Sequence, residues 1–78
     1  MHFPSREQIA ALQRQYPRGT KVELLGMDDP QAPPTGTMGE ILGVDDAGQL
    51  LVRWETGSSL SLIPGVDFFR IMQKGGQS

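Results

Sequence analysis

A turn signal is followed by a run of residues that alternate between the two faces of a β-strand in Val44-Asp45-Asp46-Ala47-Gly48-Gln49-Leu50-Leu51-Val52-Arg53-Trp54. Aspartate starts turns through its side chain, and glycine adopts a positive φ without the Cβ penalty. The segment therefore predicts a β-hairpin that turns at residues 45–49. Arg53 marks the solvent side of the strand that follows, so the alternate residues of that strand are expected to point inward: Leu50, Val52 and Trp54.

Period-two alternation continues on both sides of this hairpin. Residues 21–24 predict an earlier strand, and residues 37–44 a second one that Gly39 and Gly43 break by a bulge or a sharp bend. Residues 59–62 alternate as a fourth strand after a tight turn at 55–58, and residues 68–71 close as a fifth. Seven side chains are expected to share one interior: Val22, Leu24, Ile41, Val52, Trp54, Leu60 and Leu62.

A short helix is expected before the strands. Ser5 and Gln8 have the spacing of a capping box, Phe3 is placed to pack near Ile9, and Pro17 ends the run. A helix of about three turns is marginal alone, so its apolar stripe must dock on another surface. The stripe consists of Ile9, Leu12 and Tyr16.

Two connecting segments are rich in helix and strand breakers. Residues 27–36 contain three prolines and a closing glycine, which predict a long loop, and residues 63–67 predict a single 3₁₀ turn. The chain is thus divided into an N-terminal helix and linker (1–18), a β-domain (19–72) and a flexible tail (73–78).

Length and composition restrict the class of protein. Seventy-eight residues without cysteine form one small domain that neither disulfides nor thiolate metal sites stabilise. The sequence contains no apolar run of membrane-spanning length and no signal-peptide pattern, so a cytoplasmic protein is expected. Residues 1–20 carry three arginines against one glutamate, a balance of +2, whereas residues 21–70 carry three basic and eight acidic side chains, a balance of −5. That second balance disfavours nucleic acid as a ligand of the β-domain.

The order of strand, long loop, strand, hairpin, strand, hairpin, strand, 3₁₀ turn and strand resembles the SH3-like barrels. The expected fold is therefore a mainly β, SH3-like five-stranded small barrel with a short N-terminal α-helix. Residues 17–71 also resemble an uncharacterised domain family found on bacterial phages and conjugative or mobile elements. The motifs that carry this resemblance are Pro17-x-Gly19-Thr20, Met27-x-Asp29-Pro30, Pro33-Pro34-x-Gly36-Thr37-x-Gly39, Val44-Asp45-Asp46-x-Gly48, Trp54-x-x-Gly57-Ser58-x-Leu60 and Pro64-Gly65-x-Asp67. The resemblance implies a fold and a mobile-element setting, and assigns no activity or binding residue.

The residue types that catalysis requires do not come together in this sequence. The single histidine is His2, and no nucleophile, base and orienting group can be named as a set. Paired carboxylates at 28–29 and 45–46 lack calcium-loop spacing and suit turns or solvation. Pro30-x-x-Pro33 matches the minimal polyproline ligand, although a loop braced by proline explains it better. We therefore expect no enzyme, no metal and no cofactor.

The hypothesis that remains is a protein-binding accessory module of a phage or mobile element, docking on a basic protein through its acidic loops or an edge strand. An inhibitor of a host nucleic-acid-handling or defence protein would be one instance. The candidate contact residues are Asp28, Asp29, Asp45, Asp46, Trp54 and Glu55. The five carboxylates among them sit at turns that are expected to cluster at one end of the domain. The alternative is a nucleic-acid-binding barrel that uses Arg6, Arg14, Arg18 and Lys21. A homodimer stays open, with the helix packed either on its own barrel or across the dimer.

Overall fold

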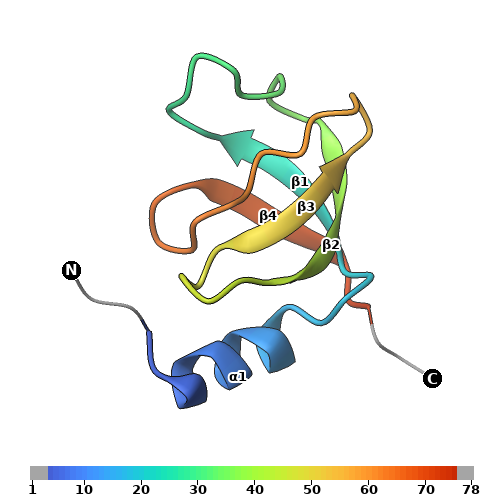
Figure 1. Cartoon of the computed structure of the whole chain (residues 1–78). Coiled ribbons are helices and arrows are strands. Elements are labelled where there is room, and N and C mark those ends of the chain that lie inside the picture. Colours follow the sequence, from blue (N-terminus) through green and yellow to red (C-terminus); the bar gives the residue numbers. More distant parts are fainter. Residues whose placement is uncertain (1–3, 76–78) are drawn as a thin grey trace.

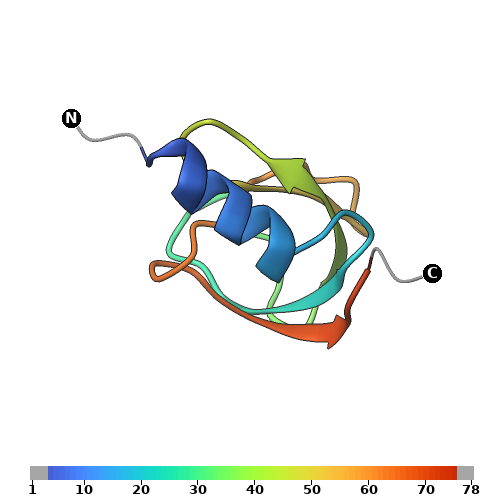
Figure 2. The same ribbon diagram turned by 90° about the horizontal axis from the view of Figure 1, so that it is seen from below.

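The computed structural model describes residues 4–75 and shows a curled four-stranded antiparallel sheet with one helix across its lower end (Figures 1 and 2). The elements are α1 (Arg6–Gln15), β1 (Lys21–Gly26), β2 (Met38–Val44), β3 (Leu50–Trp54) and β4 (Phe68–Gln73). The strands lie in the order β3-β2-β1-β4. The mainly β class and the N-terminal helix are confirmed, whereas His2, Phe3 and residues 76–78 lie outside the described residues.

The helix begins and packs as its sequence predicts. The Ser5 side chain accepts a hydrogen bond from the Gln8 N–H (3.1 Å), and the Gln8 side chain accepts one from the Ser5 N–H (2.7 Å). At the other end the ring centroids of Tyr16 and Phe69 lie 5.6 Å apart. Gly48, in the β2–β3 turn, lies against Leu12, so the helix docks on its own sheet.

The β2–β3 hairpin is confirmed at the expected residues. The Asp45 carboxylate accepts hydrogen bonds from the Ala47 N–H (3.0 Å) and the Gln49 N–H (2.8 Å). Gly48 has a φ of +80°, which a residue with a Cβ rarely adopts. Both features fix the geometry of the turn.

Two turns of the same sequence, Pro-x-Gly-Thr, lead into β1 and β2. In each turn the threonine N–H (3.0 Å) and hydroxyl (2.6 Å) both donate to the proline carbonyl, first at Pro17 and Thr20 and again at Pro34 and Thr37. The first turn exchanges two backbone hydrogen bonds with Ile41 of β2, and the second exchanges two with Leu24 of β1. Each turn therefore adds a pair of backbone hydrogen bonds between the two central strands, one pair at each end of their contact.

The interior contains seven buried apolar side chains: Val22, Leu24, Ile41, Leu50, Val52, Trp54 and Leu62. Six of them are among the seven expected from the alternation. Leu60 is half-buried instead, and Leu50 takes the seventh place. The largest is Trp54, whose indole N–H donates to the Leu60 carbonyl (2.8 Å).

The expected fourth strand at residues 59–62 is wrong. A single bridge joins Leu62 to Leu50 through two backbone hydrogen bonds of 2.8 and 2.9 Å. The Leu60 carbonyl is taken by the Trp54 indole, and the Leu60 N–H donates to the Ser58 hydroxyl (3.3 Å). Side chains thus bind the backbone groups that a longer ladder would need.

The last strand extends beyond its expected end. Residues 63–67 form a hydrogen-bonded turn, and β4 continues to Gln73, two residues past Ile71. Gly75 then donates its N–H to the Thr20 hydroxyl (3.0 Å). A Cβ at Gly75 would lie 2.3 Å from the Thr20 nitrogen, so glycine is required where these two backbone segments meet.

Charged side chains pair across the outer face of the sheet. Lys21 (3.2 Å) and Arg53 (2.9 Å) both reach the same Glu40 oxygen, and Arg70 on β4 pairs with Glu23 on β1 (2.6 Å). These pairs are exposed and add little stability each, but they fix the side of the sheet that faces water.

We expect Gly39→Ala to destabilise the domain by about 1–3 kcal/mol, because overpacking a filled core forces its neighbours to shift. A Cβ at Gly39 would lie 2.6 Å from Val52 Cγ1 and 2.7 Å from Trp54 Cε3. Gly43→Ala, in the same strand with nothing within 4 Å of its Cβ, is the matched control and should change stability by less than about 0.5 kcal/mol. Urea unfolding of both variants measures the difference, and equal losses would contradict the packing argument.

A pH dependence follows from the Glu40 ion pairs. The hydrogen bond from Arg53, then that from Lys21, lowers the pKa of the Glu40 carboxyl below its ordinary value. A lowered pKa in the folded state stabilises the protein at neutral pH, and this contribution is lost as the pH falls below the ordinary glutamate range and through the lowered pKa. In urea unfolding, Glu40→Gln should therefore differ from wild type at pH 7 and approach it at pH 3. Arg53→Gln should show the same convergence, and a constant offset in both variants would count against this cause.

Candidate functional site

The acidic residues proposed for partner binding lie at two opposite ends of the sheet. Asp28 and Asp29 follow β1, and Glu55 follows β3, so all three lie at the end away from α1. Asp45 and Asp46 lie in the β2–β3 turn beside the helix, because successive turns of an antiparallel sheet alternate between its ends. The five carboxylates therefore do not form the one cluster that the sequence suggested.

Three of these carboxylates also hold the backbone in place. Asp29 accepts the Gln31 N–H (2.8 Å), Asp45 accepts two N–H groups of its own turn, and Glu55 accepts the Met38 N–H (2.9 Å). Such side chain to backbone bonds are typical of turns. Asp28 and Asp46 are exposed.

Trp54 is a core residue. It is 1% exposed, its ring packs against Gly39, and its N–H is bonded to Leu60. The alternation of β3 already favoured this placement, and the structure leaves Trp54 beyond direct contact with a partner.

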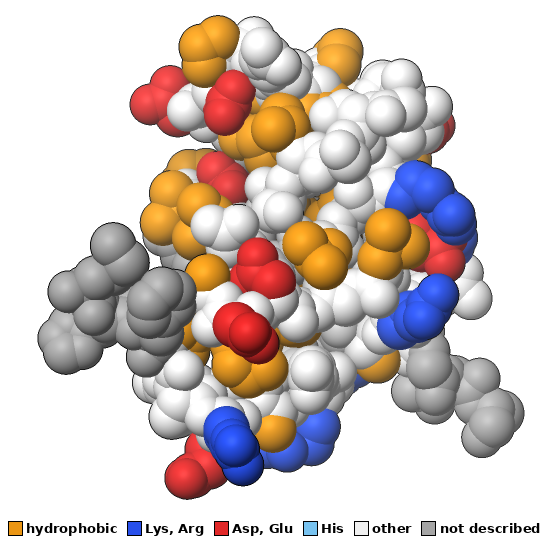
Figure 3. Space-filling view, viewed as in Figure 1, with side chains coloured by type: hydrophobic (Ala, Val, Ile, Leu, Met, Phe, Trp, Pro, Cys, Tyr) orange, Lys and Arg blue, Asp and Glu red, His pale blue; other side chains and the backbone are white. Residues whose placement is uncertain are grey.

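The four basic residues named for the alternative lie near the helix end of the molecule. Arg6 and Arg14 are exposed on α1, Arg18 lies in the turn that precedes β1, and Lys21 is paired with Glu40. Figure 3 shows Lys and Arg side chains over the helix at the bottom and along the right flank, and acidic side chains over the upper left, the middle and the lower left. We call the end of the sheet that carries Asp28, Asp29 and Glu55 the acidic loop end.

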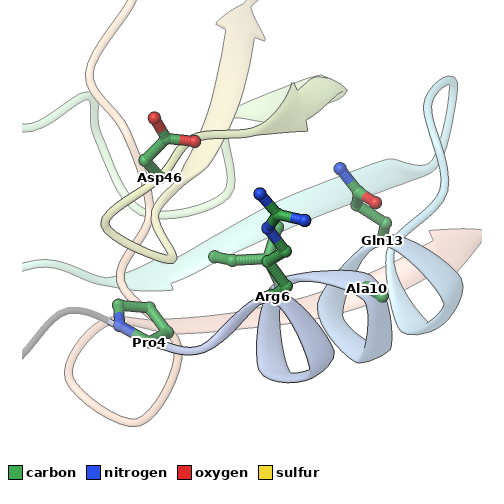
Figure 4. A pocket seen from close by; sticks show the side chains of 6 residues that line it. Pro4, Arg6, Ala10, Gln13 and Asp46 are labelled. Atoms are coloured by element: carbon green, nitrogen blue, oxygen red, sulfur yellow. The ribbon is translucent and has the colours of Figure 1, made fainter.

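A hollow separates α1 from the β2–β3 turn (Figure 4). It is lined by Pro4, Arg6, Ile9, Ala10, Gln13 and Asp46. Arg6 and Gln13 extend from the helix toward the hairpin that carries Asp46. The hollow is open and shallow, and its polar groups belong to exposed side chains.

The strongest feature of the surface is the outer edge of β4. Phe68 is 69% exposed, and three further large apolar side chains are each more than 40% exposed: Ile71 and Met72 of β4 and Leu25 of the neighbouring strand β1. We call these four residues the β4 edge surface. Leu25, Phe68 and Ile71 also line an open groove, together with Tyr16 and Phe69.

The two edges of the sheet differ in how they are covered. The outer edge of β3 is bonded to the segment after it, through Trp54 to Ser58 (3.1 Å) and Leu50 to Leu62. Within residues 4–75, β1 is the only helix or strand that packs along β4. An uncovered apolar edge strand is a surface on which another chain can add a strand.

From the sequence we expected an edge strand as one docking option, but none of the candidate contact residues belongs to the β4 edge surface. The available signal is the run Phe68-Phe69-Arg70-Ile71-Met72, in which apolar residues occupy both faces of the strand. One face of an edge strand covers the core, so apolar residues on both faces leave one set exposed.

Residues 4–75 contain no group of three or more His, Asp or Glu side chains placed to hold a metal ion. The helix of this part of the chain is too short to cross a bilayer.

Comparison with known proteins gives a family and nothing beyond it. Neither a curated protein nor a solved structure matches the chain. One family model matches residues 5–72, which include the helix, all four strands except the last residue of β4, and both Pro-x-Gly-Thr turns. A match over this share of the chain identifies the protein as a member of the domain of unknown function family DUF4314.

Proposed function

We propose that this domain is a non-enzymatic protein-binding module whose main contact is the β4 edge surface. The observation that carries the proposal is the uncovered edge of β4 beside a phenylalanine that is 69% exposed. Phenylalanine contributes a large apolar area when it is buried in an interface, and main-chain hydrogen bonds along the edge add to it.

The architecture that suits this role is an SH3-like small barrel with five strands. The order β3-β2-β1-β4 and the strong curl of the sheet support it, and so does the Leu50–Leu62 bridge, which begins to pair a fifth segment with β3. In this arrangement the segment 58–62 is a strand reduced to one bridge.

The acidic loop end is a second contact in the proposal. Asp28, Asp29 and Glu55 gather at the end of the molecule opposite the arginines of α1, and a field of this sign attracts a basic protein. The setting that the motifs suggest is a phage or mobile element in a bacterial cytoplasm. Inhibition of a host nucleic-acid-handling or defence protein would fit such a surface, because acidic side chains can occupy a groove shaped for phosphates.

The proposal predicts that affinity purification of the tagged domain from its native host retains a protein partner. Met72→Lys should reduce the retained partner about tenfold, because it places a charge within the apolar contact. Val66→Lys makes the same change at a residue that is 62% exposed and outside β4, so it should leave retention unchanged. Mass spectrometry quantifies the partner. Equal retention by the two variants would remove the edge from the proposal.

The acidic contact makes a separate prediction about salt. Retention of the partner by the wild-type domain should fall as the salt concentration rises from about 50 to 500 mM, because salt screens exposed charges. Asp28→Lys/Asp29→Lys should retain less partner, and that retention should depend less on salt.

In gel-shift titrations at low salt the wild-type domain should leave DNA and RNA unshifted at micromolar concentration. A clear shift that Arg6→Gln/Arg14→Gln abolishes would favour the nucleic-acid alternative instead.

A further inference from the structure

We infer that the partner at the β4 edge surface is a second copy of the same chain, paired antiparallel through β4 about a two-fold axis. The inference rests on the proposed function, since it names the occupant of the same surface. Four strands from each copy would then form one continuous sheet across the dimer.

The first argument is the charge at the two ends of β4. Asp67 lies directly before the strand and Lys74 directly after it. Antiparallel pairing of two identical strands places the acidic start of each at the same end as the basic end of the other, one position out of direct register, whereas parallel pairing places like charges at the same end. The strand is therefore complementary to itself in the antiparallel direction.

The second argument is that the charge within β4 is already neutralised. Arg70 is bound to Glu23 of the neighbouring strand in its own copy (2.6 Å). Of the other exposed residues of β4, Phe68, Ile71 and Met72 are apolar and Gln73 is uncharged, and the net charge of the chain is only −2. A second copy therefore meets little electrostatic repulsion at ordinary salt.

The third argument selects the register. In a two-fold antiparallel pair the central residue faces its own counterpart. Centring on Arg70 would place two guanidinium groups opposite each other, which is unfavourable. Centring on Ile71 instead places two isoleucines, each 41% exposed, opposite each other. In that register Arg70 faces Met72 of the second copy, and Phe68 faces Lys74.

In this register Phe68 and Lys74 of the two copies can form a cation–π pair. Phe68 is the most exposed large apolar residue of the described chain, and a lysine directly across from it can place its ammonium group over the ring. The pair occurs twice in the dimer, once at each end. Aromatic exposure that is costly in a monomer becomes a contact in the dimer.

Sedimentation equilibrium of the full chain tests the inference. Wild type should approach twice its mass of 8.5 kDa with rising concentration. Phe68→Lys, which sets lysine opposite lysine at both ends, should raise the dimer dissociation constant about tenfold. The double variant Phe68→Lys/Lys74→Glu should restore it, because opposite charges then face each other. Val66→Lys is the control and should dimerise as wild type does, and circular dichroism checks that each variant is folded.

Three outcomes would overturn the inference. These are a wild-type chain that stays monomeric at about millimolar concentration, a dimer that Phe68→Lys does not weaken, and a weakened dimer that Lys74→Glu does not rescue. If the chain is monomeric but Met72→Lys still loses its partner from host lysate, the proposed function stands and a different protein occupies the edge. If both experiments fail, the edge is not a binding surface.

Discussion

The structure depends on the burial of one tryptophan. Trp54 is the largest side chain of the core, and its ring occupies the space that a side chain at Gly39 would fill. Its N–H is satisfied by the Leu60 carbonyl, which a buried indole requires. The same bond draws residues 58–62 against β3 and covers that edge of the sheet. Within residues 4–75, covering one edge in this way leaves β4 as the edge of the sheet along which no further helix or strand packs.

Local chemistry made the central part of the fold predictable. The Asp45 turn, the Ser5–Gln8 capping box and the alternation of β3 each specify geometry within a few residues, and all three are confirmed. The predicted interior was right for six of its seven members because Arg53 and Lys21 mark the solvent side of their strands. The mainly β class and the helix position follow from these signals.

The failures lie where side-chain hydrogen bonds and strand order, which alternation does not encode, decide the structure. Residues 59–62 alternate like a strand, but the Trp54 indole and the Ser58 hydroxyl take the Leu60 backbone groups, and single-sequence periodicity contains no sign of that. The proposed acidic cluster failed because strand order, which places 28–29 and 45–46 at opposite ends, was not used. The β4 edge surface was missed because exposure on an edge depends on which strands remain uncovered.

The contact between Gly75 and the first Pro-x-Gly-Thr turn has a practical consequence for protein engineering. The family match ends at residue 72, and a fragment cut there would keep all buried side chains yet lose the amide that binds the Thr20 hydroxyl. Thr20 is fully buried, so truncation would open the entrance to β1 to solvent. A fragment that keeps this contact therefore extends at least to residue 75, and purification tags are best appended after a spacer that starts beyond it.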